Sequence, residues 1–267
     1  MLDNPLLPAT DGGAGGMKTI LLLGSPILRS FSPAMQNAAF RATRLSWRYL
    51  PSEGAEAAAA INAIRSDAAV IGANVTIPLK ETVIPYLDQL DVFATRVGAV
   101  NTIAKQGSKL TGYNTDVIGF RRALDECGYD VAGKPVALLG AGGAARAAAD
   151  VLRSVVSRLV VIARRAEQAQ RLIDDLEIER ARAIALETAA SSLASSAVIV
   201  NATPADLVNR DGLAVGQRLF DLRSRRSAEG RSMLLHQGAA AFEIWAGAPA
   251  PLEAMRAALE AAAAVVA

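Results

Sequence analysis

The sequence has very few residues of the kinds that bind metal ions or form disulfides. Its 267 residues include one cysteine, Cys127, and one histidine, His236. A Cys/His zinc site needs several such ligands, and a disulfide within the chain needs two cysteines. A Ser-His-Asp triad would depend on His236, and no G-x-S-x-G motif is present to hold the serine. We therefore expect no bound metal, no internal disulfide and no hydrolase triad.

Long apolar runs and runs of one charge are also missing. The uncharged stretch closest to membrane-spanning length, residues 188–205, is interrupted by serines, threonines, Asn201 and Pro204, which predicts a helix end, a buried strand and a loop. Lys and Arg total 28 against 26 Asp and Glu, and the basic residues form no long run. Partners of the membrane or nucleic-acid class are therefore not expected.

The first residues lack the basic start and the apolar run of a signal peptide. We expect residues 1–16 to be a flexible extension. Together with the single cysteine, this start favours a reducing cytoplasm as the compartment.

Apolar strands alternate with helix-prone segments along the chain, and this alternation predicts a mainly parallel sheet with helices on its faces. In the first half, the expected strands are 19–24, 46–51 and 69–78, and the expected helices are 35–43 and 55–67. In the second half, the expected segments are a helix at 120–128, a strand and helix within 134–154, a strand at 159–166, a helix at 166–177, strands within 195–206 and 218–224, and helices at 233–247 and 251–266. We expect an α/β protein of two domains, 17–115 and a dinucleotide-type domain at 116–230, with helices in 231–267 that return to the first domain.

A glycine-rich segment joins the expected strand and helix within residues 134–154. Gly140, Ala141, Gly142, Gly143 and Ala144 begin a G-x-G-x-x-A pattern in the strand-to-helix context that gives the pattern its meaning. Glycines let backbone N–H groups approach a pyrophosphate, and the helix N-terminus stabilises its charge. The alternative is a tight turn that binds no ligand.

About twenty residues further on, the next strand ends in Arg164 and Arg165, where NAD-specific proteins place an acidic residue. Guanidinium groups form paired hydrogen bonds with phosphate oxygens and suit a ribose 2′-phosphate. The pair favours NADP over NAD. The alternative is that both are solvated loop charges.

Polar residues at strand ends in the first domain suggest an acid–base site. Thr76 and Lys80 flank Pro78, which fixes the backbone after an apolar strand. A lysine can exchange a proton near neutral pH when burial or a neighbouring cation lowers its pKa, and a carboxylate such as Asp116 would hold it in place. The alternatives are a solvated charge for Lys80 and a helix N-cap for Asp116, with the helix starting near Val117.

Several segments, in order, resemble the shikimate dehydrogenase family. They are GSPILRSFSPAMQNAAF, NVTIPLK, AVNT, NTDVIGF, GAGGAARAAA, NATP and MLLHQGAAAFEIWAG, which together extend over most of residues 18–247. The resemblance implies an N-terminal α/β substrate domain, a Rossmann-type NADP-binding domain, and NADPH-dependent reduction of 3-dehydroshikimate to shikimate, a step of aromatic amino acid biosynthesis. The family contains both monomers and homodimers.

The resemblance also implies roles for individual residues. Lys80 and Asp116 match the catalytic pair of the family. The residues matched to the substrate are Ser30, Ser32 and Thr76 around its carboxylate, and Asn101 and Gln237 at its ring hydroxyls. The residues matched to NADP(H) are those of the glycine-rich segment with Arg164, Arg165, Asn201 and Thr203.

The chain departs from the family pattern mainly between residues 221 and 233. This segment is short, lacks the tyrosine that helps to hold the substrate carboxylate in the family, and omits about one helix and one strand. The NATP loop also continues as Ala205-Asp206, where the family commonly has a glycine near the nicotinamide. Arg29, Arg223, Arg225 and Arg226 are candidates to attract the carboxylate instead, the alternative for the last three being exposed loop charges. These departures leave open a quinate- or aminoshikimate-type dehydrogenase, or a non-catalytic NADP-binding protein.

Overall fold

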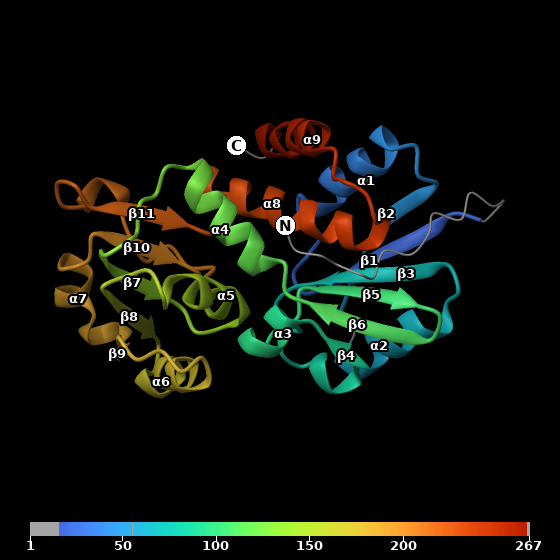
Figure 1. Cartoon of the computed structure of the whole chain (residues 1–267). Coiled ribbons are helices and arrows are strands. Elements are labelled where there is room, and N and C mark those ends of the chain that lie inside the picture. Colours follow the sequence, from blue (N-terminus) through green and yellow to red (C-terminus); the bar gives the residue numbers. More distant parts are fainter. Residues whose placement is uncertain (1–15, 55, 266–267) are drawn as a thin grey trace. The chain divides into compact units, whose positions relative to one another are not determined.

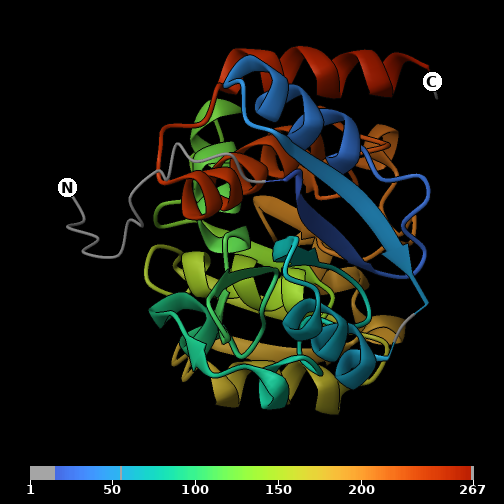
Figure 2. The same cartoon turned by 90° about the vertical axis from the view of Figure 1, so that its right-hand side faces the viewer.

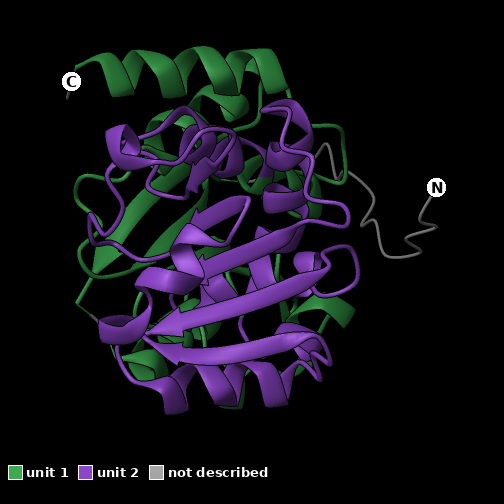
Figure 3. Cartoon of the chain, turned by 90° about the vertical axis from the view of Figure 1, so that its left-hand side faces the viewer, with its two compact units in different colours: residues 1–94, 100–115, 237–267 green, residues 95–99, 116–236 purple. Residues whose placement is uncertain are grey.

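A computed structural model describes residues 16–54 and 56–265 and divides the chain into two compact units (Figures 1 and 3). The described parts of residues 1–94, 100–115 and 237–267 form unit 1, and residues 95–99 and 116–236 form unit 2. Apart from Gly16, the expected extension at 1–16 lies outside the described residues.

Residues 95–99, which we expected in the first domain, and residues 231–236, which we expected among the helices that return to it, belong to unit 2. In Thr95–Ala99, Arg96 forms two hydrogen bonds of 2.6 Å with the buried carboxylate of Asp150. In residues 231–236, Ser232 donates a 2.8 Å hydrogen bond to Glu126, and His236 lies 2.5 Å from the same carboxylate. These polar contacts attach both segments to helices of unit 2.

Unit 1 contains a six-stranded mixed sheet in the order β2-β1-β3-β5-β6-β4. Its strands are β1 (Lys18–Gly24), β2 (Trp47–Glu53), β3 (Val70–Val75), β4 (Gln89–Leu90), β5 (Thr102–Gln106) and β6 (Lys109–Tyr113). Its helices are α1 (Ser32–Ala42), α2 (Ala57–Ser66), α9 (Leu252–Ala264), the first half of α3 (Val92–Val97) and the second half of α8 (Ala228–Ala246).

The expected parallel arrangement is present in β1, β2 and β3, but β5 pairs antiparallel with both β3 and β6. The β5–β6 hairpin is absent from the expected elements. It turns at Gly107 and Ser108, and Gly107 has a φ of +61°. A two-residue loop of this kind needs positive φ angles, which glycine adopts without strain.

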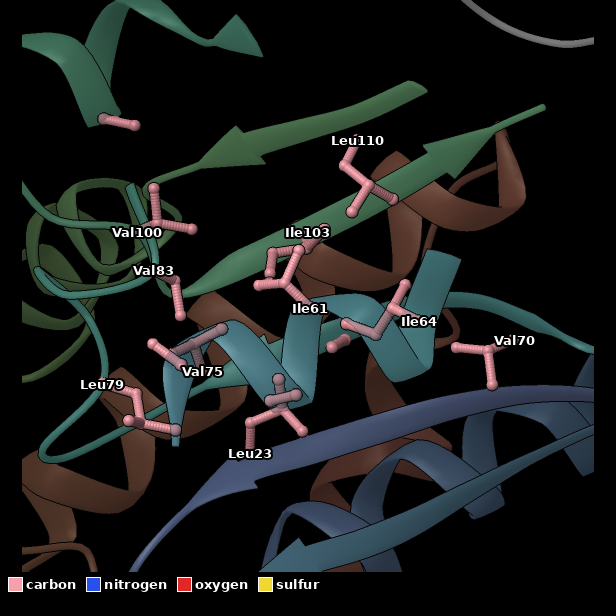
Figure 4. Close-up of a cluster of buried hydrophobic side chains, with 14 residues drawn as sticks. Leu23, Ile61, Ile64, Val70, Val75, Leu79, Val83, Val100, Ile103 and Leu110 are labelled. Atoms are coloured by element: carbon pink, nitrogen blue, oxygen red, sulfur yellow. The ribbon is translucent and has the colours of Figure 1, made fainter. Parts of the chain in front are cut away.

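Apolar side chains fill the space between the unit 1 sheet and α2. Ile61 and Ile64 of α2 pack against Leu23, Val75 and Ile103, all at most 2% exposed (Figure 4). The alanine-rich sequence of α2 favours a helix, and its isoleucines supply the apolar stripe. This core fixes the ends of β1 and β3, which carry the candidate site residues.

Helices from both ends of unit 1 pack together, and α9 lies along α1 (Figure 2). Phe40 of α1 stacks on Phe242 of α8 at 6.0 Å between ring centroids. Trp245 of α8 donates a 2.9 Å hydrogen bond to the carbonyl oxygen of Ile103. A Cβ at Gly72 would lie 2.5 Å from that oxygen and 2.6 Å from the indole nitrogen, so only glycine fits there.

Unit 2 contains a five-stranded parallel sheet in the order β11-β10-β7-β8-β9. Its strands are β7 (Pro135–Leu139), β8 (Arg158–Ala163), β9 (Ala181–Ala185), β10 (Val198–Asn201) and β11 (Arg218–Asp221). Its helices are α4 (Asp116–Glu126), α5 (Gly143–Leu152), α6 (Ala166–Asp175), α7 (Ala190–Ala194) and the first half of α8. In order along the chain the strands lie 3-2-1-4-5, the Rossmann arrangement without its sixth strand.

The predicted Rossmann-type topology is therefore confirmed, and β9 is an additional strand that we did not expect. Its sequence, ARAIA, contains three alanines and an arginine, which have low strand propensity, and only Ile184 is buried. The strand forms because it pairs with β8 along its length at the edge of the sheet.

The sheet of unit 2 is covered by apolar side chains on both faces. On one face, Phe220 of β11 meets Phe120 of α4 and Tyr129, at 5.2 and 4.9 Å between ring centroids. On the other face lies a cluster made of Ala137, Leu139, Val160, Ile162, Ile184, Ala189, Ile199 and Leu219. Burial on both faces explains why β7, β8 and β10 are continuous apolar runs.

The connection from β11 to α8 consists of six residues, 222–227, and contains no further helix or strand. The segment is short, as the sequence indicates. Within the described ranges, no helix has the length and apolar character to cross a membrane, and no cluster of three or more acidic, histidine or cysteine side chains is suited to a metal ion.

Candidate functional site

The centre of the candidate substrate site in unit 1 is the buried side chain of Asn101, which is 3% exposed. Its amide nitrogen donates hydrogen bonds to Thr115 Oγ1 at 2.9 Å and to Gln237 Oε1 at 3.2 Å. Its Oδ1 accepts a 2.7 Å hydrogen bond from the backbone N–H of Thr115. The structure thus brings together Asn101 and Gln237, which are 136 positions apart in sequence.

A second buried amide, Asn74 at the end of β3, extends this network. Its nitrogen donates to the carbonyl oxygen of Asn101 at 3.1 Å and to Thr102 Oγ1 at 2.9 Å. Its Oδ1 accepts a 2.8 Å hydrogen bond from the hydroxyl of Tyr49. Three segments of the sheet are therefore joined by side-chain hydrogen bonds around Asn101.

Tyr49 is a member of this network that the sequence reasoning missed. It lies on β2 and is fully buried, and burial raises the pKa of its hydroxyl well above the usual range, while a hydrogen bond with the Ser32 side chain acts in the opposite direction. The signal in the sequence was weak, since a tyrosine in a strand is ordinarily a packing residue. Its contacts connect Ser32 with the network of Asn74.

Thr76 directly follows β3, whereas Ser30 lies in the connection from β1 to α1 and Ser32 is the first residue of α1. Ser30 Oγ accepts a 3.2 Å hydrogen bond from the N–H of Ser32. The N–H of Thr76 donates to the carbonyl oxygen of Leu23 at 2.8 Å. Ligands collect beyond the carboxyl ends of the strands in α/β sheets, so the three hydroxyls occupy a suitable place for a polar ligand.

Lys80 lies in the turn that follows β3, and its side chain is partly exposed. Its carbonyl oxygen accepts a 2.7 Å hydrogen bond from Val100, the residue before Asn101. Asn101 in turn holds the N–H of Thr115, the residue before Asp116. Two consecutive residues of unit 1, Val100 and Asn101, therefore form hydrogen bonds with the backbone of Lys80 and with the backbone just before Asp116.

Asp116 is the first residue of α4 and is 4% exposed. The helix thus begins one residue earlier than expected, with the carboxylate in its first turn. The positive end of the helix dipole stabilises an anion at this position.

The glycine-rich segment of unit 2 lies between β7 and α5, as predicted. Gly140 has a φ of +113°, and a Cβ there would come within 3.3 Å of the carbonyl oxygen of Ala202 and of Thr203 Cγ2. The Cβ of a residue at Gly142, in contrast, would meet no atom within 4 Å. Gly142 is the N-cap of α5, and no side chain caps this helix. The first N–H groups of α5 thus have no side-chain cap, and such groups can bind a phosphate.

The loop after β10 lies beside this glycine-rich segment. Asn201 Oδ1 accepts hydrogen bonds from the N–H and the hydroxyl of Thr203, at 3.1 and 2.8 Å. Strands β7 and β10 are neighbours at the point where the strand order reverses, which is where dinucleotides bind in this fold. The structure thus brings Thr203 and Gly140 together at the expected cofactor position.

Arg164 and Arg165 follow β8, the other neighbour of β7, and both are exposed. Within the described part of the chain neither side chain takes part in an ion pair. Their guanidinium groups are available for an anionic ligand such as a ribose phosphate. The site thus fits NADP: a glycine-rich turn, an uncapped helix N-terminus and a basic pair lie at the carboxyl ends of adjacent strands.

Arg223, one of the candidates to replace the missing tyrosine, is paired with acidic residues of unit 2. Its Nη2 lies 2.6 Å from Asp221 Oδ2 and 2.8 Å from Asp206 Oδ1, so two carboxylates occupy this guanidinium. Arg225 and Arg226 are exposed, which agrees with the alternative that they are loop charges. Arg29 is exposed as well.

Comparison with known proteins covers nearly the whole chain. Three family profiles match: the shikimate dehydrogenase substrate binding domain over residues 22–103, shikimate / quinate 5-dehydrogenase over residues 122–214, and the shikimate 5'-dehydrogenase C-terminal domain over residues 230–260. The shikimate dehydrogenase (NADP(+)) of Moorella thermoacetica is 38% identical, over 88% of this chain and 90% of the relative.

Solved structures agree with this result. Shikimate 5-dehydrogenase of Thermus thermophilus, in complex with NADP(H) and shikimate, is 30% identical with a TM-score of 0.79, covering 92% of this chain and all of that one. Quinate dehydrogenase of Corynebacterium glutamicum, in complex with NAD, has a TM-score of 0.81, covering 92% of this chain and all of that one, but at 24% identity it supports the fold alone.

Proposed function

Because the chain belongs to the shikimate dehydrogenase family, we propose that it is an NADP-dependent oxidoreductase that interconverts 3-dehydroshikimate and shikimate. The observation that carries this proposal is the buried network of neutral amide and hydroxyl groups around Asn101 in unit 1. A polyhydroxylated acid needs many uncharged hydrogen-bonding partners.

We assign Lys80 and Asp116 to proton transfer. Bound NADPH supplies a hydride to the carbon of the ketone. In our proposal, the ammonium group of Lys80 gives a proton to the ketone oxygen as the hydride arrives, and it takes the proton back in the reverse direction. The Asp116 carboxylate orients Lys80 and favours its charged form. The attachment of both backbones to residues 100 and 101 supports treating the two as a pair.

We assign the remaining residues of unit 1 to substrate binding. Ser30, Ser32 and Thr76 supply hydroxyl groups to the substrate carboxylate, the serines from the connection between β1 and α1 and the start of α1, and the threonine from the end of β3. Asn101 and Gln237 bind the ring hydroxyls. Their mutual hydrogen bond of 3.2 Å is longer than the 2.9 Å bond from Asn101 to Thr115 Oγ1, which supports their opening to admit a hydroxyl group.

For the cofactor, we assign the pyrophosphate to the glycine-rich segment at residues 140–144 and the nicotinamide side to Asn201 and Thr203. Arg164 and Arg165 hold the 2′-phosphate. Their exposure and lack of ion pairs among the described residues support this role.

The partners in this proposal are small molecules, the hydroxy acid and NADP(H), and the compartment is the reducing cytoplasm, on the sequence grounds given above. The chain acts as a monomer or as a homodimer. Analytical ultracentrifugation with and without NADP distinguishes these states.

Steady-state kinetics with a panel of acids tests the substrate. Purified protein is mixed with NADP and shikimate or quinate, with NAD as the control cofactor, and reduced nicotinamide is followed by absorbance. We expect saturable NADP reduction with shikimate. A preference for quinate would indicate a quinate-type dehydrogenase, an alternative that the absent tyrosine leaves open. NADPH binding without turnover of any acid would support a non-catalytic protein.

Substitution of Lys80 tests the assigned chemistry. Lys80→Ala is compared with Lys109→Ala, which removes an exposed lysine of the same unit from the β5–β6 hairpin. Loss of one acid–base group lowers turnover by about 10²- to 10⁴-fold. We expect this loss in Lys80→Ala only, with NADPH binding retained in both variants. Full turnover by Lys80→Ala would disprove its role.

A further inference from the structure

The two aspartates that hold Arg223 lie on different segments of unit 2. Asp221 ends β11, whereas Asp206 lies in the loop after β10 that also carries Asn201 and Thr203. The Arg223 Nη2 bridges them, at 2.6 Å from Asp221 Oδ2 and 2.8 Å from Asp206 Oδ1. The candidate cofactor loop is therefore connected to the short turn that follows β11.

Asp221 holds the guanidinium group of Arg223 in place without any contribution from Asp206. The Asp221 side chain is 3% exposed and accepts hydrogen bonds from the N–H, Nε and Nη2 of Arg223, at 2.6 to 3.0 Å. The Arg223 side chain is only 15% exposed, and that of Asp206 is 72% exposed. Part of the weakness of an exposed ion pair is the entropy lost when both side chains are ordered, and here the arginine is already ordered.

The turn that carries Arg223 is also rigidly built. Ser227 Oγ donates to the carbonyl oxygen of Asp221 at 2.5 Å and accepts from the N–H of Gly230 at 2.9 Å. A Cβ at Gly230 would lie 2.6 Å from the carbonyl carbon of Arg223, so the first turn of α8 packs directly on the turn. The segment between β11 and α8 is thus a compact anchor.

The loop at residues 201–206 is joined to neighbouring segments at its start: the N–H of Ala202 donates to the carbonyl oxygen of Leu139 at 2.9 Å, and the carbonyl oxygen of Asn201 accepts from the N–H of Leu222 at 2.9 Å. Beyond Ala202 the described contacts give it few other fixed points. Asn201 and Thr203 bond mainly to each other and to Ala205: the amide nitrogen of Asn201 donates to the Ala205 carbonyl oxygen at 3.0 Å. These bonds shape the loop without joining it to another element. Asp206 provides such a connection, to Arg223.

We propose that Asp206 and Arg223 are positioning residues that hold the loop of Asn201 and Thr203 in the conformation that binds the nicotinamide side of NADP(H). The resemblance to the family implies that the chain is shortened at the anchor and that the family commonly has a glycine where Ala205 and Asp206 stand. The ion pair thus stabilises a loop beside a shortened part of the unit. The effect on NADP(H) rests on the proposed function, whereas the effect on the loop does not.

Hydrogen exchange tests the loop directly in the complete chain without ligand. The variant is Asp206→Asn, and the matched control is Asp130→Asn, which removes an aspartate of similar exposure, 70%, from an ion pair with Lys134 in the same unit. Loss of the pair should speed amide exchange in residues 202–207 by about two- to fivefold. The control should leave this segment unchanged. Equal exchange in wild type and Asp206→Asn would overturn the proposal.

NADPH binding and kinetics then separate positioning from general stability. We expect Asp206→Asn to raise the dissociation constant for NADPH by about two- to fivefold, with the KM for shikimate and the unfolding midpoint unchanged. Asp206→Glu should restore most of the affinity, since it keeps the charge. An unchanged dissociation constant would refute the role in binding. If wild type binds no NADPH, the proposed function fails, while the exchange experiment still decides whether the pair holds the loop.

Discussion

Replacing Tyr49 by phenylalanine should weaken unit 1 and its substrate site together. The hydroxyl of Tyr49 is buried and donates the one hydrogen bond that Asn74 Oδ1 receives within the described part of the chain, at 2.8 Å. Tyr49→Phe leaves that buried oxygen without a donor, because the new ring has no polar atom. A buried acceptor without a partner costs about 1–3 kcal/mol, which is the expected loss in the free energy of unfolding.

The two tryptophans make this loss measurable for unit 1 alone. Trp47 and Trp245 are the only tryptophans of the chain, and both lie in unit 1. Urea unfolding followed by tryptophan fluorescence therefore reports on this unit. Tyr86→Phe is the control, since Tyr86 is 44% exposed and its substitution should change the free energy of unfolding by less than about 0.5 kcal/mol.

The kinetic consequence should be selective. The amide nitrogen of Asn74 also donates to Asn101 and Thr102, so a displaced Asn74 disturbs the proposed substrate contacts. We expect a higher KM for shikimate and an unchanged KM for NADP in Tyr49→Phe. If this variant unfolds at the same urea concentration as Tyr86→Phe, or if the two KM values rise equally, the reasoning from the buried network is wrong.

Three further predictions concern packing, cofactor choice and pH. Gly72→Ala should lower the free energy of unfolding of unit 1 by about 1–3 kcal/mol, because the added methyl group displaces the Trp245 indole; fluorescence in urea would show it, and an unchanged midpoint would contradict it. Replacing Arg164 and Arg165 by alanine should raise the KM for NADP and leave that for NAD unchanged, and an equal rise in both KM values would disprove a 2′-phosphate contact. Burial, followed by the neighbouring Glu229, raises the pKa of Tyr129 from 10 to about 12, so the neutral phenol is favoured in the folded state. Its contribution to the stability of unit 2 is complete below pH 10 and is lost as the pH rises from 10 to about 12; circular dichroism during alkaline titration should show a smaller loss in Tyr129→Phe.

The sequence was most informative where one element determines its own structure. The apolar runs of β7, β8 and β10 and the glycines after β7 predicted the Rossmann-type unit and the position of its phosphate-binding turn. Strand β9 was missed because its alanines and arginine carry no strand signal, and it forms through pairing with β8. The β5–β6 hairpin had a usable signal, a Gly107-Ser108 pair between alternating residues, which went unrecognised.

In the candidate site too, residues within a sequence motif could be predicted, whereas residues whose role depends on contacts between distant segments could not. Motifs identified Lys80, Asn101 and Gln237, but the roles of Tyr49 and Asn74 depend on contacts across three strands. Arg223 was interpreted by charge alone, as a group that attracts a substrate. Its partners follow from the short turn after β11, whose geometry no local pattern describes.

Transfer of an isotopic label tests the central claim most directly. The protein is incubated with 3-dehydroshikimate and NADPH that carries deuterium at the reactive position of the nicotinamide, and the products are analysed by mass spectrometry. We predict shikimate that contains one deuterium, formed in equal amount to NADP. Tight NADPH binding with no labelled shikimate would contradict the claim.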